Sequence, residues 1–413
     1  MKTGLTGIVV LWALMVTGCA GALPQPQVIA PATPRAEFIP TASEAMTADP
    51  EIDHAVPTAT QTATPSATAL LTFTATPFVY AYGPGDFPER VNPLTGLPVD
   101  QPALLERRPI VIKVTNFPRS VRPQWGLSQA DHVYEYYIGD NMSRFVGVFY
   151  GKDAERVGPI RSARLFDAHV MRLYHGIFIF GWADDAVLNY LFAPDLKFHL
   201  IVEMDDNCPP LCRIGPKAAY NTLYADTTHI AAYLTKRRTN NDRQDLSGLR
   251  FELETHASGN RGERLAIQYS LVSYHRWEYD PQAGLYLRFQ ETRAKNIDEG
   301  ELAPLTDSLS EAQLSATNVI VLFVPHQYFK KSSSTEIIDQ PFMGQGAGYA
   351  FRDGQVYPLT WRRRAADRLP ELLLPNDRLY PLKPGNTWFE IVGESTQFEQ
   401  LEDGSWDFMF SIP

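Results

Sequence analysis

The chain has 413 residues, with 37 basic and 47 acidic side chains, so its formal net charge is −10 at pH 7. Because proteins bind nucleic acid by neutralising phosphates with lysine and arginine, this acidic balance argues against nucleic acid as a partner. Hydrophobic residues make up 44% of the chain, which is enough to build a large core and excludes a wholly disordered protein.

The N-terminus has the pattern of a bacterial export signal. Lys2 is followed by an almost continuous apolar run over residues 5–16, which is shorter than the roughly 20 residues of a transmembrane helix. The run ends in Val16–Cys19 (VTGC), which resembles a lipobox. We therefore expect residues 1–19 to form a lipoprotein signal peptide and lipobox, with Cys19 lipidated. The alternative is an ordinary signal peptide cleaved among the small residues 19–22.

Residues 20–89 are rich in proline, threonine and alanine, and they show neither helical nor strand periodicity. Repeated proline removes backbone donors and favours extended conformations, so we expect a disordered, semi-stiff stalk. Two acyl chains anchor a protein stably, and the stalk would lift the folded part away from the bilayer. The expected location is therefore the outer side of the cell membrane, with the membrane as partner through the lipid anchor.

The segment from residue 90 to 245 is predicted to be a mixed α/β region. Branched aliphatic and aromatic residues favour strands over residues 109–115, 132–138, 144–150 and 176–180, and residues 139–143 suggest a hairpin. A helix is predicted over residues 162–174, where apolar side chains recur at helical spacing on one face.

From residue 246 to 413 the pattern changes to short strands separated by turn residues. Asp353–Gly354 lies between two strand patterns, which is the strongest short signal for a hairpin. We expect a β-rich C-terminal region here. The predicted fold class is therefore α+β, with a mixed α/β N-terminal region and a β-rich C-terminal region that could pack as one unit.

With Cys19 assigned to the anchor, Cys208 and Cys212 remain as a pair. Outside the cytoplasm such a pair tends to oxidise, so a disulfide is the favoured interpretation. The alternatives are free thiols or half of a metal site. A zinc site would need two further soft ligands, which no second cysteine pair or paired-histidine motif supplies, so we expect no metal.

The strongest candidate for a binding site is Gly158–Arg164 (GPIRSAR), a turn that leads into the predicted helix. The free N–H groups at a helix N-terminus favour an anion, and Ser162 could cap the helix there. Arg161 and Arg164 would add forked donors that suit a carboxylate or a phosphate. These residues suggest an anion-recognition site.

An internal ion-pair network is the competing interpretation, and the one we favour. Glu135 lies in an apolar strand pattern, where a buried carboxylate needs a partner. Arg144 or one of the two arginines of the turn could be that partner. Arg122 and Asp131 could join either the anion site or the network.

Signatures of enzymes are mostly missing. The sequence contains no phosphate-binding P-loop, no His-Glu-x-x-His motif and no nucleophile elbow, so we expect no cofactor. Ser162 with His169 or His175 could be imagined as nucleophile and base, but His169 falls on the apolar row of the helix and is expected to be packed. Exposed tryptophans could form a glycan platform, but core packing is favoured for most of them. These residues are Trp125, Trp182, Trp277, Trp361 and Trp388.

Several motifs spread over the folded part resemble those of the YerB-like bacterial lipoproteins. The resemblance implies export, lipidation, and an N-terminal and a C-terminal domain of unknown function, and it supplies no catalytic residues. The Tyr136–Tyr137 pair and the Cys208–Cys212 loop depart from the pattern of that family. The matching segments are Asn92–Pro98 (NPLTGLP), Arg122–Asp131 (RPQWGLSQAD), Arg144–Phe145, Val157–Arg164 (VGPIRSAR), Tyr349–Gly354 (YAFRDG) and Pro384–Trp388 (PGNTW).

Taken together, the sequence favours a membrane-tethered binding or scaffold module of the cell envelope over an enzyme. Its partner would be an envelope ligand or an envelope protein. The alternative is a hydrolase or transferase that acts on an envelope polymer. A surface cleft that joins the charged residues would favour ligand binding or catalysis, whereas their complete burial would favour a structural role.

Overall fold

The computed structural model describes residues 81–413, except for residues 205–206, 216–219, 256, 294–300 and 333–334. The predicted signal peptide, Cys19 and most of the predicted stalk therefore lie outside the described residues. Among the described residues, no helix combines the length and the hydrophobicity that a membrane span requires.

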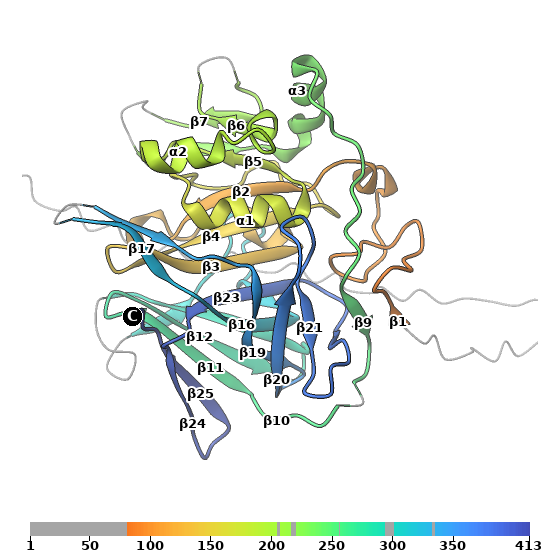
Figure 1. The fold of residues 1–413 in the computed structure, drawn as a ribbon, viewed down its shortest axis with the longest axis vertical. Coiled ribbons are helices and arrows are strands. Elements are labelled where there is room, and N and C mark those ends of the chain that lie inside the picture. Colours follow the sequence, from red (N-terminus) through yellow and green to blue (C-terminus); the bar gives the residue numbers. More distant parts are fainter. Residues whose placement is uncertain (1–80, 205–206, 216–219, 256, 294–300, 333–334) are drawn as a thin grey trace, which may run out of the picture. The chain divides into compact units, whose positions relative to one another are not determined.

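An eleven-stranded mixed sheet forms the centre of the fold (Figure 1). Its strands run in the order β10-β20-β19-β16-β23-β3-β4-β2-β5-β6, with β21 paired to β20. Their bounds are Asn260–Arg261 (β10), Gln355–Arg363 (β20), Gly344–Arg352 (β19), Asn318–Val324 (β16), Thr387–Gly393 (β23), His132–Gly139 (β3), Met142–Phe149 (β4), Ile110–Thr115 (β2), Ile177–Phe180 (β5), Leu200–Val202 (β6) and Glu371–Leu373 (β21).

A seven-stranded sheet packs against one face of the large sheet, and the two share a hydrophobic core. Trp277 from the smaller sheet and Trp388 from the larger one meet in that core, with ring centroids 5.0 Å apart. The strand order is β14-β13-β12-β11-β25-β24, with β15 on β13. The bounds are Leu302–Pro304 (β14), Leu285–Glu291 (β13), Ser273–Asp280 (β12), Arg264–Ser270 (β11), Ser405–Met409 (β25), Gln397–Gln400 (β24) and Ser315–Ala316 (β15).

Helices α1 and α2 cover the opposite face of the large sheet, where a second core forms. The smaller elements complete the fold around its edges. The helices are Leu165–Tyr174 (α1), Asp185–Leu191 (α2) and Ile230–Arg237 (α3), and the 3-10 turns are Pro102–Glu106, Arg119–Val121, Leu127–Gln129, Lys197–His199 and Thr227–His229. The remaining strands are Ala81–Tyr82 (β1), Arg250–Glu252 (β9), Pro381–Leu382 (β22), Gln327–Lys331 (β17), Glu336–Asp339 (β18), Leu211–Arg213 (β7) and Leu223–Ala225 (β8).

The fold is predominantly β, with less helix than the α+β class expected from the sequence implies. Strands account for 43% of the structure and helices for 13%. The four strands predicted in the N-terminal region are confirmed as β2, β3, β4 and β5, and both predicted hairpins are present. In the second hairpin, Asp353 and Gly354 both have positive φ angles, of 54° and 71°, which explains the Asp-Gly pair.

Strands from the two predicted regions alternate within the large sheet. Strand β23, from the C-terminal region, pairs in parallel with β3, from the N-terminal region, and places Glu390 beside Glu135. The two regions therefore share one sheet, and the carboxylates of two distant segments become neighbours.

Candidate functional site

Strand β3 carries charged clusters on both of its faces. Because successive side chains of a strand point to opposite sides, Glu135 faces the smaller sheet and Tyr136 faces helix α1. We call the group on the Glu135 side, made of Glu135, Glu390, His275 and Arg288, the inter-sheet network. We call the group on the Tyr136 side, made of Lys113, Arg144, Arg161 and Arg164 around Asp167, the basic cluster.

The inter-sheet network is built around the guanidinium group of Arg288. Its Nη2 donates to Glu135 Oε2 at 2.6 Å, and its Nη1 donates to Glu390 Oε1 at 3.1 Å. All four side chains of the network have no exposed surface. Arg288 thus joins two carboxylates of the large sheet to strand β13 of the smaller sheet.

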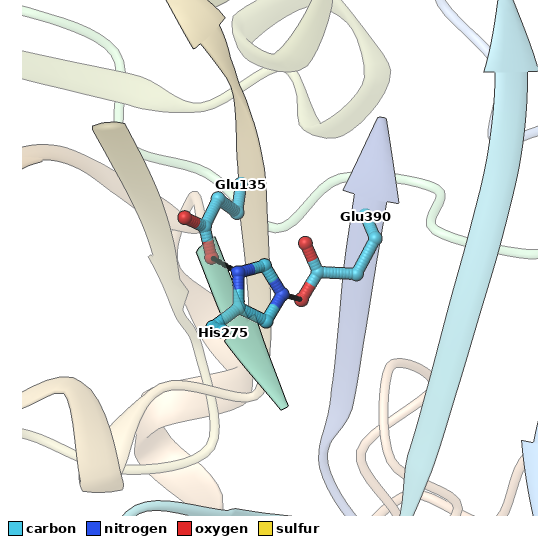
Figure 2. Close-up of side chains that lie close together, drawn as sticks. All are labelled: Glu135, His275 and Glu390. Carbon is cyan, nitrogen blue, oxygen red and sulfur yellow. Dashed lines mark hydrogen bonds and ion pairs between the residues drawn. The ribbon is translucent and has the colours of Figure 1, made fainter. Parts of the chain in front are cut away.

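His275 lies between the same two carboxylates (Figure 2). Its Nε2 is 3.0 Å from Glu390 Oε1, and its Nδ1 is 3.8 Å from Glu135 Oε2. Trp277 Nε1 and Ser143 Oγ donate further hydrogen bonds to Glu390 and Glu135, respectively. Burial raises the pKa of Glu390 to about 7, and burial lowers the pKa of His275 well below its ordinary value.

The ligand atoms of Glu135, His275 and Glu390 all lie within 4.8 Å of one another, as those of a metal site would. The donor set is suitable, but Arg288 already occupies both carboxylates, so a cation would have to displace a fully buried guanidinium. Because a buried ion pair that loses one partner is strongly destabilised, the arrangement fits a structural network better than a metal centre.

The basic cluster lies beside the carboxyl ends of two parallel strands, β2 and β5. The turn from Gly158 to Arg164 runs across these ends: Arg161 N donates to Lys113 O at 3.4 Å, and Gly181 N donates to Arg161 O at 3.1 Å. Ala163 N donates to Trp182 O at 2.8 Å. In sheets with parallel strands, ligands commonly bind outside the carboxyl ends, so this is a favourable place for a site.

Asp167, in the first turn of α1, is the acidic centre of the basic cluster. Its Oδ1 accepts hydrogen bonds from Lys113 Nζ, at 3.0 Å, and from the Tyr136 hydroxyl, and its Oδ2 accepts one from Arg164 N at 2.7 Å. Lys113, Tyr136 and Asp167 are fully buried. The negative charge of Asp167 is therefore already balanced by Lys113 and by the N–H group at the start of α1.

The three arginines of the basic cluster have no acidic partner of their own. In the part of the chain that the structure describes, no carboxylate oxygen lies within 4.0 Å of a side-chain nitrogen of Arg144, Arg161 or Arg164. Arg144 is only 9% exposed, and its Nη1 donates to the carbonyl oxygen of Ser162 at 2.7 Å. Arg161 Nε is buried without a hydrogen-bond partner.

The closely spaced positive charges help to lower the pKa values of Arg144 and Lys113 in the basic cluster. The pKa of Arg144 is lowered well below its ordinary value by burial and by the charges of Arg164 and Arg161. Burial lowers the pKa of Lys113 to about 7; Asp167 opposes this shift, while Arg144 and Arg164 add to it. An anion placed beside the three guanidinium groups would relieve this repulsion.

The structure divides the charged residues named from the sequence into three sets. Arg144, Arg161, Ser162 and Arg164 come together at the basic cluster. The expected pairing of Glu135 with one of these arginines is wrong, because Glu135 faces the other side of the sheet and pairs with Arg288.

Arg122 and Asp131 lie apart from the basic cluster. Arg122 forms a double hydrogen bond to Glu291, at 3.0 and 3.1 Å, and connects to the inter-sheet network indirectly, through Asn116 and through Glu291 and Gln290. Asp131 accepts hydrogen bonds from the backbone N–H groups of Tyr150 and Gly151, so it holds a turn together.

Two further expectations concern the start of α1 and the cysteine pair. The helix begins at Leu165 rather than at Ser162, because Arg164 occupies the N-cap position and its N–H group is bound by Asp167. His169 is 9% exposed, as expected for a packed residue. Cys208 and Cys212 are joined by a disulfide in the structure, directly before and within β7.

The residues that sequence reasoning missed are Lys113 and Asp167 in the basic cluster, and His275, Arg288 and Glu390 in the inter-sheet network. Each is a charged or titratable side chain inside an apolar strand or helix pattern, which by itself signals a buried partner. The partners could not be matched from the sequence, because Glu135 and Arg288 are 153 positions apart.

Comparisons with known proteins agree with the family resemblance. Residues 94–240 match the model of the N-terminal domain of the protein family of unknown function DUF3048, and residues 265–389 match the model of its C-terminal domain. The chain is 26% identical to "Putative lipoprotein YerB" of Bacillus subtilis (strain 168) over 314 residues, which cover 73% of this chain and 85% of YerB.

A solved structure has the same fold. The crystal structure of the YerB protein from Bacillus subtilis aligns with 73% of this chain and 96% of its own, with a TM-score of 0.61 and 23% sequence identity. This likeness concerns the fold and says nothing about a ligand. Because the two domain models together match more than half of the sequence, the chain belongs to the YerB-like DUF3048 family.

Proposed function

We propose that the chain is a membrane-tethered binding module of the cell envelope that recognises an anionic group through Arg144, Arg161 and Arg164. The observation that carries the proposal is the gathering of three guanidinium groups with no carboxylate partner among the described residues. Several other buried arginines are paired with acids, as in Arg107–Asp153, Arg122–Glu291 and Arg288–Glu135, whereas the buried Arg363 has no such partner in the described part of the chain and donates to carbonyl oxygens such as that of Phe342.

The charge balance of the basic cluster supports an anionic ligand. Four cationic side chains surround one carboxylate, and Asp167 is already bound to Lys113. Burying a charge without a partner is costly, so an anion that binds Arg144 would recover part of that cost. Guanidinium groups also offer paired donors that match the oxygens of a carboxylate or a phosphate.

The tether is supported by the sequence and by the relative. YerB is named as a putative lipoprotein, and the lipobox-like segment that ends at Cys19 predicts the same anchor here. A lipid on Cys19, followed by the proline-rich segment, would hold the fold near the outer side of the membrane. The basic cluster would then meet ligands of the envelope.

A titration with inorganic phosphate and sulfate tests the anion site. The protein for this experiment comprises residues 20–413, because a chain that began at residue 90 would lack β1, which pairs with β9. We expect Arg161→Ala combined with Arg164→Ala to weaken anion binding at least about tenfold, since a hydrogen bond to a charged group contributes about 1.5–3 kcal/mol.

The matched control is Arg261→Ala combined with Arg264→Ala. These two arginines are also three positions apart, but they are exposed and paired with acids. The control should bind anions as the wild type does. Unchanged affinity in the double variant of the basic cluster, together with a loss of stability, would show that the arginines are structural and would refute the site.

A further inference from the structure

Exposed hydrophobic side chains are concentrated in the segment of the chain that begins beside the basic cluster. Of the fifteen large hydrophobic residues that are exposed in the described part of the chain, seven lie between residues 182 and 220. Single exposed hydrophobic residues are common on soluble proteins, but a concentration of them in one segment marks an interaction surface. This segment contains α2, β6 and β7, which lie close together at one end of the large sheet (Figure 1).

Two of these residues adjoin the basic cluster, Tyr220 through its ring and Trp182 through its backbone. Tyr220 is 77% exposed, its ring centroid is 5.6 Å from the guanidinium carbon of Arg161, and its carbonyl oxygen accepts a hydrogen bond from Arg161. Trp182 is 59% exposed, and its carbonyl oxygen binds Ala163 N, between Arg161 and Arg164 in sequence. An exposed aromatic ring therefore lies directly against the basic cluster.

Met204 and Ile214 are two further exposed hydrophobic side chains of this segment. They are 59% and 46% exposed, and they follow β6 and β7, respectively. An ion pair between Glu203 and Arg213 joins the two neighbouring segments, and Ile214 N donates to Thr222 O at 2.7 Å, close to Tyr220 in the chain. Hydrogen bonds and an ion pair thus connect the apolar surface back to the basic cluster.

The amount of uncompensated charge favours a phosphate over a carboxylate. Once Lys113 and Asp167 are counted as a pair, the three arginines carry three positive charges without a counter-charge among the residues that the structure describes. A carboxylate would supply one negative charge. A phosphate monoester supplies about two and offers three acceptor oxygens, which matches three guanidinium groups better.

We propose that the ligand is a phosphate-bearing amphiphile, whose phosphate binds Arg144, Arg161 and Arg164 and whose apolar chain lies over the exposed side chains of Trp182, Met204, Ile214 and Tyr220. This inference rests on the proposed anion site and specifies its ligand class. A basic centre continuous with an apolar surface complements a molecule that joins an anionic head to a hydrocarbon chain. A lipid anchor on Cys19 would hold the protein where such amphiphiles reside.

The experiment compares alkyl phosphates of increasing chain length, each below its micelle-forming concentration, on residues 20–413. Ethyl, butyl and octyl phosphate are titrated, together with octanoate as the carboxylate counterpart. Each buried methylene contributes about fourfold in affinity, so octyl phosphate should bind at least about tenfold more tightly than ethyl phosphate even if the chain is only partly buried. Octanoate should bind at least about tenfold more weakly than octyl phosphate.

Substitutions test where the alkyl chain of the ligand lies on the protein surface. Trp182→Ala combined with Tyr220→Ala should remove most of the gain from ethyl to octyl phosphate. Leu271→Ala combined with Phe329→Ala is the matched control, since both side chains are 57% exposed at other places. The control should retain the full gain, and the chain-length series on the wild type decides the question if a variant does not fold.

The outcomes separate this inference from the proposed function. If inorganic phosphate binds but chain length has no effect, the amphiphile is refuted and the anion site stands. Equal affinity for octanoate and octyl phosphate refutes the phosphate specificity. If neither phosphate nor octanoate binds, the anion site itself fails. Binding to anionic vesicles without binding to monomeric octyl phosphate would assign the surface to a bilayer instead.

Discussion

The buried charges on the two faces of strand β3 are compensated to different extents. On the face of Glu135, two carboxylates meet one guanidinium and one imidazole, and every carboxylate oxygen has a donor nearby. On the face of Tyr136, four cationic groups meet one carboxylate. The inter-sheet network is closed and nearly balanced, whereas the basic cluster has an excess of one sign and reaches the surface through Arg161 and Arg164.

This difference separates a structural role from a binding role more clearly than burial does. Lys113 and Arg288 are both fully buried, and both form ion pairs with carboxylates. What distinguishes their surroundings is the charge left over once the partners are counted. A network whose charges compensate one another holds the fold together, and a cluster with an excess of positive charge favours a further anion.

The largest effect is expected from Arg288→Met. The substitution leaves Glu135 and Glu390 buried without their common cation, and breaking a buried ion pair costs about 3–5 kcal/mol. Chemical denaturation should show a loss of this size in the free energy of unfolding. Arg264→Met, at an exposed arginine, should cost less than about 1 kcal/mol. Equal losses for the two variants would contradict a structural role for the network.

The pH dependence of stability should report the proton held by the inter-sheet network. The folded-state pKa of Glu390 is raised from 4.5 to about 7, so the folded state keeps a proton that the unfolded chain has lost. This contribution to stability is fully present below pH 4.5 and is lost as the pH rises through about 7. The free energy of unfolding should therefore fall between pH 5 and 8.

Glu390→Gln should make that fall smaller by an amount on the order of 1 kcal/mol. The glutamine imitates the protonated carboxyl and does not titrate. Asp131, whose pKa burial raises to about 6, is unchanged in the variant, so the fall that remains serves as an internal control. An identical pH profile in the two proteins would place the proton elsewhere.

The sequence predicted individual strands and hairpins better than it predicted which strands and side chains pair. Runs of branched aliphatic and aromatic residues located β2 to β5, and Asp353–Gly354 located the β19–β20 hairpin, because these features depend on neighbouring residues. The structure has less helix than the α+β class implies, because most of its elements are strands of the two large sheets. Pairing between strands far apart in sequence, such as β3 with β23, leaves no local signal.

Distant strand pairing also explains why the sequence predicted only part of the candidate site. Arg161, Ser162 and Arg164 stand in one short segment, so their proximity could be read directly. Arg144 comes from β4 and Lys113 from β2, and only the antiparallel pairing of these strands brings them to the same place. The pairing of Glu135 was predicted wrongly because strand alternation on β3 decides which face it takes.

Arg144→Gln should separate binding from stability at the basic cluster. Glutamine keeps a donor for the carbonyl of Ser162 and removes a buried charge that is repelled by Arg161 and Arg164. We expect the free energy of unfolding to change by less than about 1 kcal/mol and phosphate affinity to fall about tenfold. A loss of stability as large as that of Arg288→Met would make Arg144 structural.

The smallest expected effect is on the pH dependence of anion binding. Because the pKa of Lys113 is lowered to about 7, this lysine is charged below pH 7 and increasingly neutral above it. Sulfate does not titrate in this range, so a change in its affinity with pH reports on the protein. The affinity should be highest below pH 7 and should fall by a few fold as the pH rises through 7. Below pH 8, sulfate binding should be accompanied by the uptake of a fraction of a proton by Lys113. In Lys113→Met the affinity should be weaker at pH 6 and nearly independent of pH. If the dependence survives in that variant, the proton taken up on binding belongs to another group, and Lys113 serves only to fix Asp167 beneath the three arginines.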